Sequence, residues 1–171
     1  ARALARRFDL VHVDTGAMYR AVALRASQRG ISEHDDAGLE RFVGGLRIRF
    51  EGTDGAARRI LEGDEDLSVA IRSPEVSRLA SRYSANPVVR RAMVQLQRDL
   101  GAQGGLVLDG RDVGSVVFPD AEVKVFLDAD AAARAERRSR ELADQGVSED
   151  PDATRRSMAE RDRQDRSRAH A

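Results

Sequence analysis

Two short clusters in this sequence combine glycine, arginine and carboxylate side chains in an order that suits phosphate binding. They are residues 14–20 (DTGAMYR) and residues 109–114 (DGRDVG). In the first cluster a hydroxyl and a glycine stand at a predicted helix start, where backbone N–H groups and the helix dipole favour an anion. In the second, two glycines permit close backbone approach, and Arg111 offers a planar fork for phosphate. The alternative is a capping threonine, a packed tyrosine and surface ion pairs; we favour a phosphate site.

A third cluster, residues 160–168 (ERDRQDRSR), is dense in charge. On a helix, Arg161, Asp165 and Arg168 fall at positions i, i+4 and i+7, which form one stripe. Taken alone, such a stripe is more typical of a solvated face with ion pairs along it than of a site.

The first two clusters each follow a short apolar run, and a third run ends in the same way. Residues 8–13, 106–108 and 123–127 are predicted strands that end at Asp14, Asp109 and Asp128. Because helical segments separate them, they predict a parallel sheet that helices cover on both faces. Ligands of open parallel sheets bind beyond the carboxyl ends of the strands. The strand ends therefore place the first two clusters where a ligand would bind.

Apolar and arginine residues alternate over residues 46–50, as in a half-exposed strand. A turn at 52–55 and a second strand at 57–61 follow. We therefore predict a small antiparallel lobe inserted into the α/β chain.

Helices are predicted at 17–30 and 35–44 and after two start signals, Ser73-Pro74 and Asn86-Pro87. From residue 131 onward the chain is helical and arginine-rich, with an interruption near 146–151.

Composition excludes several classes of protein. The 171 residues carry 29 basic and 29 acidic side chains, so the net charge of zero disfavours nucleic-acid and anionic-membrane partners. The absence of cysteine excludes disulfides, thiolate metal sites and a cysteine nucleophile, and three histidines form no metal-type cluster. The apolar runs are too short to cross a membrane, and no signal-peptide pattern is present. These features predict one domain with a small lobe in a cytoplasmic protein.

Five segments together resemble the bacterial cytidylate kinases, a family of P-loop nucleoside-monophosphate kinases. They are residues 13–20, 63–77, 109–120, 123–128 and 161–169, in the order of that family. The resemblance implies an α/β fold with a parallel sheet flanked by helices, a small antiparallel nucleotide-binding lobe and a helical lid. It divides the chain into core (1–45), CMP-binding lobe (46–83), core (84–133), and lid with an arginine-rich helix (134–171).

The resemblance also implies an activity and roles for individual residues. The activity is phosphoryl transfer from ATP to CMP and dCMP, giving ADP and CDP or dCDP, with Mg²⁺ as cofactor and a monomeric enzyme. No metal ligand is assigned to the protein itself. The acceptor phosphate would be held by Thr15, Tyr19, Arg20, Arg111 and Arg168; the cytosine would be read by Ser81, Arg90 and Asp112; and the ribose would be held by Arg161 and Asp165. Arg134, Arg137 and Arg138 match the start of the lid, which presents arginine toward the donor phosphates; Arg111, Arg168, Arg137 and Arg138 are the expected catalytic residues.

One feature of the family does not occur in these 171 residues. The family's glycine-rich loop ends in Gly-Lys-Ser/Thr and holds the donor phosphates, whereas the single lysine here is Lys124, inside a predicted strand. We therefore expect the loop, and the family's last strand and helix, to lie outside this sequence. The alternatives are a catalytically inactive module that binds nucleotide, and a kinase for another small acceptor such as UMP or shikimate.

Overall fold

The computed structural model describes residues 1–51, 59–144, 146 and 150–167, and of residues 161 and 164–167 it describes only the helical backbone. The chain divides into two compact units, Ala1–Pro119 (the first unit) and Asp120–Ala171 (the second unit).

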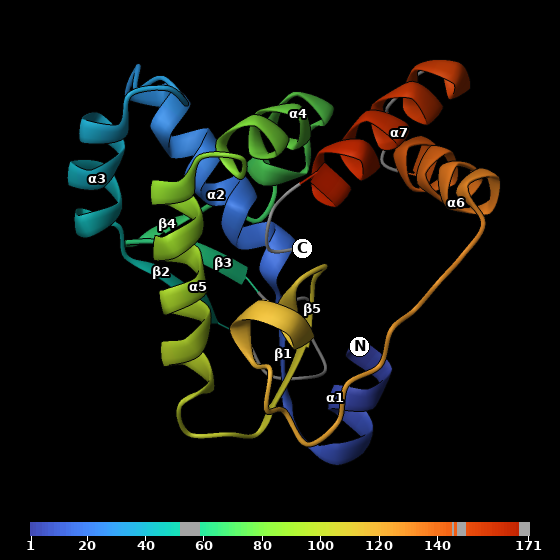
Figure 1. The fold of residues 1–171 in the computed structure, drawn as a ribbon, viewed down its shortest axis with the longest axis horizontal. Helices are drawn as coiled ribbons and strands as arrows, with labels where there is room; N and C mark the ends of the chain where they lie inside the picture. Colours follow the sequence, from blue (N-terminus) through green and yellow to red (C-terminus); the bar gives the residue numbers. More distant parts are fainter. Residues whose placement is uncertain (52–58, 145, 147–149, 168–171) are drawn as a thin grey trace. The chain divides into compact units, whose positions relative to one another are not determined.

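A parallel pair of strands forms the centre of the first unit. Strand β1 (Val11–Asp14) pairs with β5 (Leu106–Asp109), and the register sets Asp14 opposite Asp109. Figure 1 shows the two strands side by side, with the short helix α1 (Arg2–Phe8) near them. The parallel sheet flanked by helices confirms the predicted fold class. Its register brings the two phosphate-type clusters to the same edge of the sheet.

Four helices build most of the core around this pair. They are α2 (Thr15–Gln28), α3 (Asp36–Gly45), α4 (Pro74–Tyr83) and α5 (Pro87–Gly101). Helix α2 is central: Met18, Ala21 and Val22 are fully buried, and it contacts α3, α4 and α5. Small side chains on α2 let the other helices approach closely, which suits a densely packed interior.

The predicted starts of two helices are confirmed. The hydroxyl of Ser73 accepts a hydrogen bond from the N–H of Val76 at 3.1 Å, which caps α4. The amide oxygen of Asn86 accepts from the N–H of Val88 at 2.8 Å, which caps α5. Such caps satisfy backbone donors that the first helical turn leaves without partners.

A second, antiparallel sheet contains β2 (Ile48–Glu51), β3 (Arg59–Glu62) and β4 (Glu65–Asp66). It confirms the predicted meander; the predicted turn at 52–55 and the first residues of the strand predicted at 57–61 lie outside the described residues. Arg25 of α2 joins this sheet to the core, because its Nε lies 3.1 Å from Glu62 and its Nη2 donates to Glu65. That hydrogen bond holds the pKa of Glu65 below its usual value. A short turn, η1 (Ala70–Arg72), leads from the sheet to α4.

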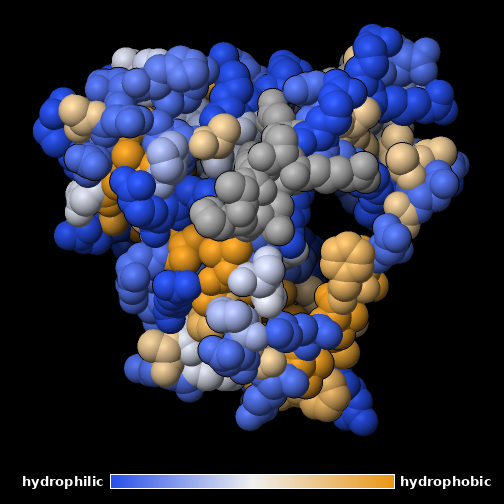
Figure 2. Space-filling view, viewed as in Figure 1, coloured by the Kyte–Doolittle hydropathy of each residue, from blue (hydrophilic) through white to orange (hydrophobic). Residues whose placement is uncertain are grey.

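Two strand predictions are wrong. Phe8 belongs to helix α1 and is exposed, so β1 begins three residues later than predicted. Residues 123–127 form no strand, and Val125, Phe126 and Leu127 are more than two-thirds exposed. An apolar run becomes a strand only where a neighbour supplies the opposing N–H and C=O groups, and no described segment pairs with this one. Figure 2 shows hydrophobic surface along the segment that leads to α6.

The second unit is a helical pair, α6 (Ala131–Asp144) and α7 (Pro151–Ser167). Its two helices agree with the prediction of a helical, arginine-rich end, and Gly146 and Asp150, the described residues between them, are not helical. Among the described residues, no helix has the length and apolar character needed to cross a membrane.

Replacing Tyr83 by phenylalanine should destabilise the first unit. The Tyr83 hydroxyl, on a ring only 3% exposed, donates to the carbonyl of Ile31 at 2.5 Å and so ties α4 to the loop after α2. Removing it leaves that carbonyl without this partner, and the free energy of unfolding in urea at neutral pH should fall by about 1–2 kcal/mol.

The pH dependence provides the control for this variant. Burial raises the pKa of the Tyr83 phenol, so its contribution is complete below the usual pKa of tyrosine and is lost as the pH rises through the raised value. The difference in stability between the wild-type protein and Tyr83→Phe should therefore shrink in alkaline solution. Equal stabilities at neutral pH would contradict the role of this hydrogen bond.

Candidate functional site

The carboxyl end of the β1–β5 pair carries the first predicted cluster. Asp14 caps α2: its carboxylate accepts from the N–H of Ala17 at 3.0 Å and from Nη2 of Arg20 at 2.9 Å. Arg20 is thus held along the first turns of α2, beside the N–H groups at the helix start. This arrangement places one guanidinium and one helix N-terminus together, both of which attract an anion.

Thr15 connects the first cluster to the second. Its side chain is buried, and its hydroxyl donates to the carbonyl of Asp109 at 2.9 Å, across 94 residues of sequence. Gly110 follows directly, and a Cβ at this position would overlap the Thr15 hydroxyl and lie 2.7 Å from a methyl carbon of Val113. The glycine of the DGRD motif therefore permits the second cluster to pack directly on the start of α2.

Substituting Gly110 by alanine tests this close packing. Because the Thr15 hydroxyl cannot both keep its hydrogen bond and clear the new methyl group, the free energy of unfolding should fall by about 1–3 kcal/mol. Chemical denaturation measures the change. Gly44→Ala is the matched control, since a Cβ at that helical glycine would meet no atom within 4 Å. A Gly110→Ala protein as stable as the control would show that the loop has room to move.

The predicted base-reading residues come from two helices and the same loop. Arg90 of α5 donates through Nη2 to the carboxylate of Asp112 at 2.5 Å, and both side chains are less than one-fifth exposed. Ser81 lies on α4 and is half-buried. After Asp112 the chain forms one turn of π-helix, η2 (Val113–Val117). Arg98 of α5 donates hydrogen bonds to the carbonyls of Val116 and Val117 at the end of this turn. The loop that carries Asp112 is therefore fixed to α5 at both ends.

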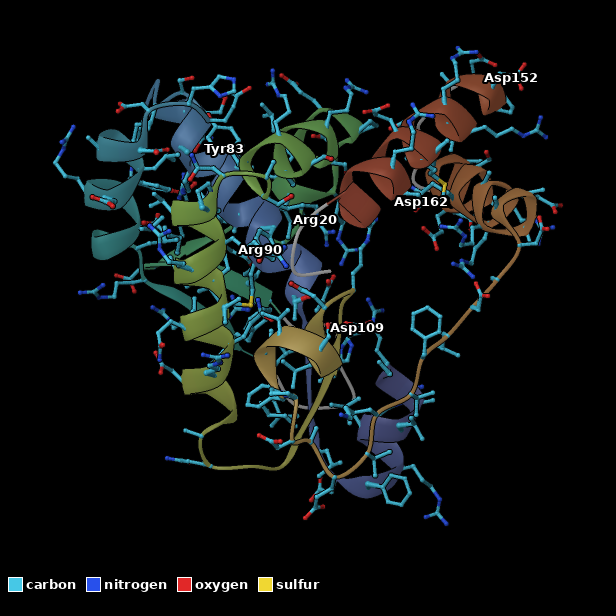
Figure 3. The ribbon with its side chains drawn as sticks, in the orientation of Figure 1. Arg20, Tyr83, Arg90, Asp109, Asp152 and Asp162 are labelled. Atoms are coloured by element: carbon cyan, nitrogen blue, oxygen red, sulfur yellow. The ribbon has the colours of Figure 1, made fainter. Side chains whose placement is uncertain are left out.

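Three carboxylates at this edge of the sheet each lie close to a nitrogen atom of a basic side chain. Asp14 binds Arg20, Asp112 binds Arg90, and Nε2 of His12 lies 3.3 Å from Oδ1 of Asp109. Figure 3 labels Arg20 on α2, Arg90 on α5 and Asp109 at the end of β5. The carboxylates hold the guanidinium groups in position before any ligand binds, which lowers the entropic cost of binding a phosphate or a base.

Two other predicted members of this site lie on the same elements. Tyr19 is on α2, half-buried and packed against the core, and Arg111 is exposed on the loop between Gly110 and Asp112. Arg111 follows Gly110, which packs on the start of α2, so its exposed side chain extends from the loop at this strand end.

The remaining predicted residues belong to the second unit. Arg137 is exposed, and Arg138 is half-buried with its Nη1 3.4 Å from Glu141 of the same helix. The backbones of Arg161 and Asp165 are helical in α7, but their side chains, and all of Arg168, lie outside the described residues. The predicted convergence of Arg20, Arg111 and Arg168 therefore stays a prediction.

Sequence reasoning did not find one residue at this site. His12 faces Asp109 because β1 and β5 are adjacent and parallel, which a strand pattern alone does not specify. The sequence predicts close backbone approach at Gly110, whereas the identity of its contact, Thr15, depends on that same pairing. One feature of the sequence could have indicated His12: it lies two residues before Asp14 on the same strand, and such residues point to the same face of the sheet.

A separate groove of about 540 Å³ lies between α3 and α5. Its lining includes Glu40, Arg47, Arg91 and Asp99, together with apolar residues such as Leu96, and none of the predicted site residues. It is therefore distinct from the strand-end site.

Comparison with known proteins identifies the family. The family model for cytidylate kinase matches residues 1–171. A cytidylate kinase of Geobacter sp. is 51% identical over 168 residues, which is 98% of this chain and 72% of that protein. A cytidylate kinase of Syntrophotalea carbinolica is 48% identical over 171 residues, covering 100% of this chain and 72% of that protein. A bifunctional pantoate ligase/cytidylate kinase of Parasynechococcus marenigrum is 42% identical over 99% of this chain and 34% of that protein. With the strand-end site in place and matches of this extent, this chain belongs to the cytidylate kinase family.

Proposed function

We propose that this protein transfers the terminal phosphoryl group of ATP to CMP and to dCMP, giving ADP and CDP or dCDP. The observation that carries the proposal is the packed junction of the DTG helix start and the DGRD loop, joined by the Thr15–Asp109 hydrogen bond in a chain of this family. In this proposal the junction unites Arg20, Arg111 and the Arg90–Asp112 pair in one CMP site.

The chemistry asks little of the protein beyond placing charge. An oxygen of the acceptor phosphate is the nucleophile and is already ionised, so no general base is required. Arg20 and Arg111 bind the acceptor phosphate, and a ligand phosphate takes over part of the hydrogen bonding that Asp14 gives Arg20. Positioned positive charge around the migrating group and alignment of the two nucleotides lower the barrier to phosphoryl transfer.

The arginine-rich helices of the second unit complete the proposal. Arg137, Arg138 and Arg168 neutralise phosphate charge as it develops, and Arg161 and Asp165 hold the ribose hydroxyls. Tyr19 packs beside the acceptor phosphate, and Ser81 contributes to the cytosine site with Arg90 and Asp112. The antiparallel sheet of β2 to β4 belongs to the lobe that encloses CMP.

The described residues do not fit a resident metal site. Among them no group of three or more histidine, aspartate or glutamate side chains is placed to hold an ion, and Asp14 and Asp109 already face Arg20 and His12. Mg²⁺ characteristically binds through substrate phosphates and water. We infer that Mg²⁺ accompanies ATP, and none of the steps above depends on it.

Two measurements on the complete protein test the function. A coupled assay should show ADP formation that depends on CMP or dCMP, and calorimetry should show CMP binding without ATP. Binding without turnover would identify the inactive nucleotide-binding module instead, and faster turnover with UMP or shikimate would identify a different acceptor. If the complete protein shows no CMP binding and no turnover, the proposal is refuted. We further propose a cytoplasmic monomer without nucleic-acid or membrane partners, in keeping with the zero net charge; light scattering tests the monomer.

A further inference from the structure

Arg134 makes a bidentate ion pair within the second unit. Its Nη1 and Nη2 donate to Oδ1 and Oδ2 of Asp162 at 3.0 and 2.7 Å, so the two planar groups meet edge to edge and join α6 to α7 across 28 residues. Figure 3 shows Asp162 on the side of α7 that meets α6. Both side chains are about one-quarter exposed. Bidentate pairs of this kind fix geometry more strongly than a single contact between charges.

The same guanidinium holds a third segment. Its Nε donates to the carbonyl of Ala129 at 3.2 Å, just before α6 begins. The hydrogen bonds to Asp162 raise the pKa of Arg134, and the nearby carboxylates of Asp128 and Asp130 act in the same direction. All three nitrogen atoms of Arg134 are therefore engaged inside the second unit.

The apolar packing between α6 and α7 is small. Among the described residues of the second unit, only Ala135, Leu142 and Thr154 are buried. So few buried side chains fix the angle and rotation of two helices poorly, because precise packing comes from interlocking side chains. The Arg134–Asp162 pair is thus a specific contact, among the side chains that the structure describes, that can set how the two helices face each other.

The other two arginines of the same motif differ from Arg134. Arg137 is exposed and makes no ion pair within the part of the chain that the structure describes, and Arg138 has one contact, to Glu141 on its own helix. These two guanidinium groups remain accessible to a phosphate, whereas binding by Arg134 would require breaking its contacts to Asp162.

We propose that Arg134 is a positioning residue that fixes α6 to α7, and that Arg137 and Arg138 alone of the three contact donor phosphates. This inference rests on the proposed kinase function. The family resemblance places all three arginines at the start of the lid and names only Arg137 and Arg138 of them as catalytic; the proposal gives Arg134 a role of its own. Arg134 acts through Asp162, by setting α6 against the helix that carries positions 161 and 165.

A double-mutant cycle in the complete protein tests this role. Arg134→Gln and Asp162→Asn should each lower kcat/KM by about five- to tenfold, and the loss in the double variant should be well below the product of the two single losses, because both variants break the Arg134–Asp162 contact. Arg134→Lys keeps the positive charge but cannot make two parallel hydrogen bonds to Asp162, so its kcat/KM should lie between those of Arg134→Gln and the wild-type protein. Glu136→Gln is the matched control: it breaks the exposed Glu136–Arg140 pair on the same helix and should leave kcat/KM unchanged.

A readout without nucleotide separates this proposal from the kinase function. Amide hydrogen exchange in α6 and α7 should quicken by about fivefold or more in both single variants and no further in the double variant. If the wild-type protein lacks kinase activity, this measurement still decides the role of the pair. Direct phosphate binding by Arg134 would instead give a kinetic loss in Arg134→Gln, control-like behaviour in Asp162→Asn, and a double variant equal to Arg134→Gln. Either that pattern or exchange rates equal to those of the wild type would overturn the proposal.

Discussion

Replacing Arg111 by alanine in the complete protein should lower kcat for CMP by about 10²- to 10³-fold, in the range expected when one preorganised donor to a developing charge is lost. Arg111 lies between Gly110, which packs on the start of α2, and Asp112, which is fixed to α5. Both neighbours are held, so its exposed guanidinium is presented from a rigid loop. KM for CMP should rise less than kcat falls, because the contact strengthens as charge builds on the transferring group.

Arg91→Ala is the matched control for this variant. Arg91 is 69% exposed on α5 and lines the separate groove, with Glu40 4.0 Å away. Its removal changes net charge by the same amount and should leave kcat within about twofold, as is usual for surface substitutions away from special features. Full activity of Arg111→Ala, or an equal loss in both variants, would remove Arg111 from the site.

Local signals predicted the helices well. Ser73-Pro74 and Asn86-Pro87 each combine a capping side chain with a residue preset for the first helical position, and both helices begin there. The antiparallel sheet was predicted from alternation in one strand and turn residues after it. These features depend on residues within a few positions of each other, so a single sequence contains them.

The errors arose where structure depends on partners distant in sequence. Residues 123–127 are as apolar as a buried strand, yet no described segment pairs with them. Phe8 likewise belongs to helix α1, although the apolar residues after it predicted that a strand begins at Phe8. Apolar content marks a segment that can be buried but does not say what will bury it.

The same limit applies to the candidate site. The sequence predicted that the DTG and DGRD clusters meet at one sheet edge, and the β1–β5 register agrees. It did not predict that Thr15 would bind the Asp109 carbonyl or that Arg90 would bind Asp112. With 28 arginines and 29 carboxylates in the chain, charge alone cannot specify which pairs form. Only the packing of α2, α5 and β5 selects them.

Replacing Asp112 by asparagine should change the choice of base as well as the rate. Cytosine carries an exocyclic amino donor and an unprotonated ring nitrogen, whereas uracil presents an acceptor and an N–H at these positions. The Asp112 carboxylate can accept from the amino group, and Arg90 can donate to the ring nitrogen or the carbonyl. The ion pair at 2.5 Å holds both groups in place, and each is less than one-fifth exposed.

A site of this kind rejects the wrong base because its own polar groups would be left unpaired. We therefore expect kcat/KM for CMP to fall by about a hundredfold in Asp112→Asn and kcat/KM for UMP to fall much less. The ratio of kcat/KM for CMP to kcat/KM for UMP should therefore decrease by about tenfold or more. Steady-state kinetics with both substrates on the complete protein measures this ratio. Asp99→Asn, an exposed carboxylate at the end of α5, is the control and should leave the ratio unchanged.

The competing explanation is that Asp112 serves only to hold an arginine in place. If that arginine is Arg111, which binds the phosphate in this proposal, kcat/KM would fall by the same factor with CMP and with UMP; if it is Arg90, the CMP/UMP ratio would change only through Arg90. Arg90→Met separates the two explanations further: if Asp112 reads the base itself, some preference for CMP persists without Arg90, and adding Asp112→Asn abolishes it. If Asp112 only holds Arg90, the double variant has the same CMP/UMP ratio as Arg90→Met alone. An unchanged ratio in Asp112→Asn would therefore end the base-reading role, whatever happens to the rate.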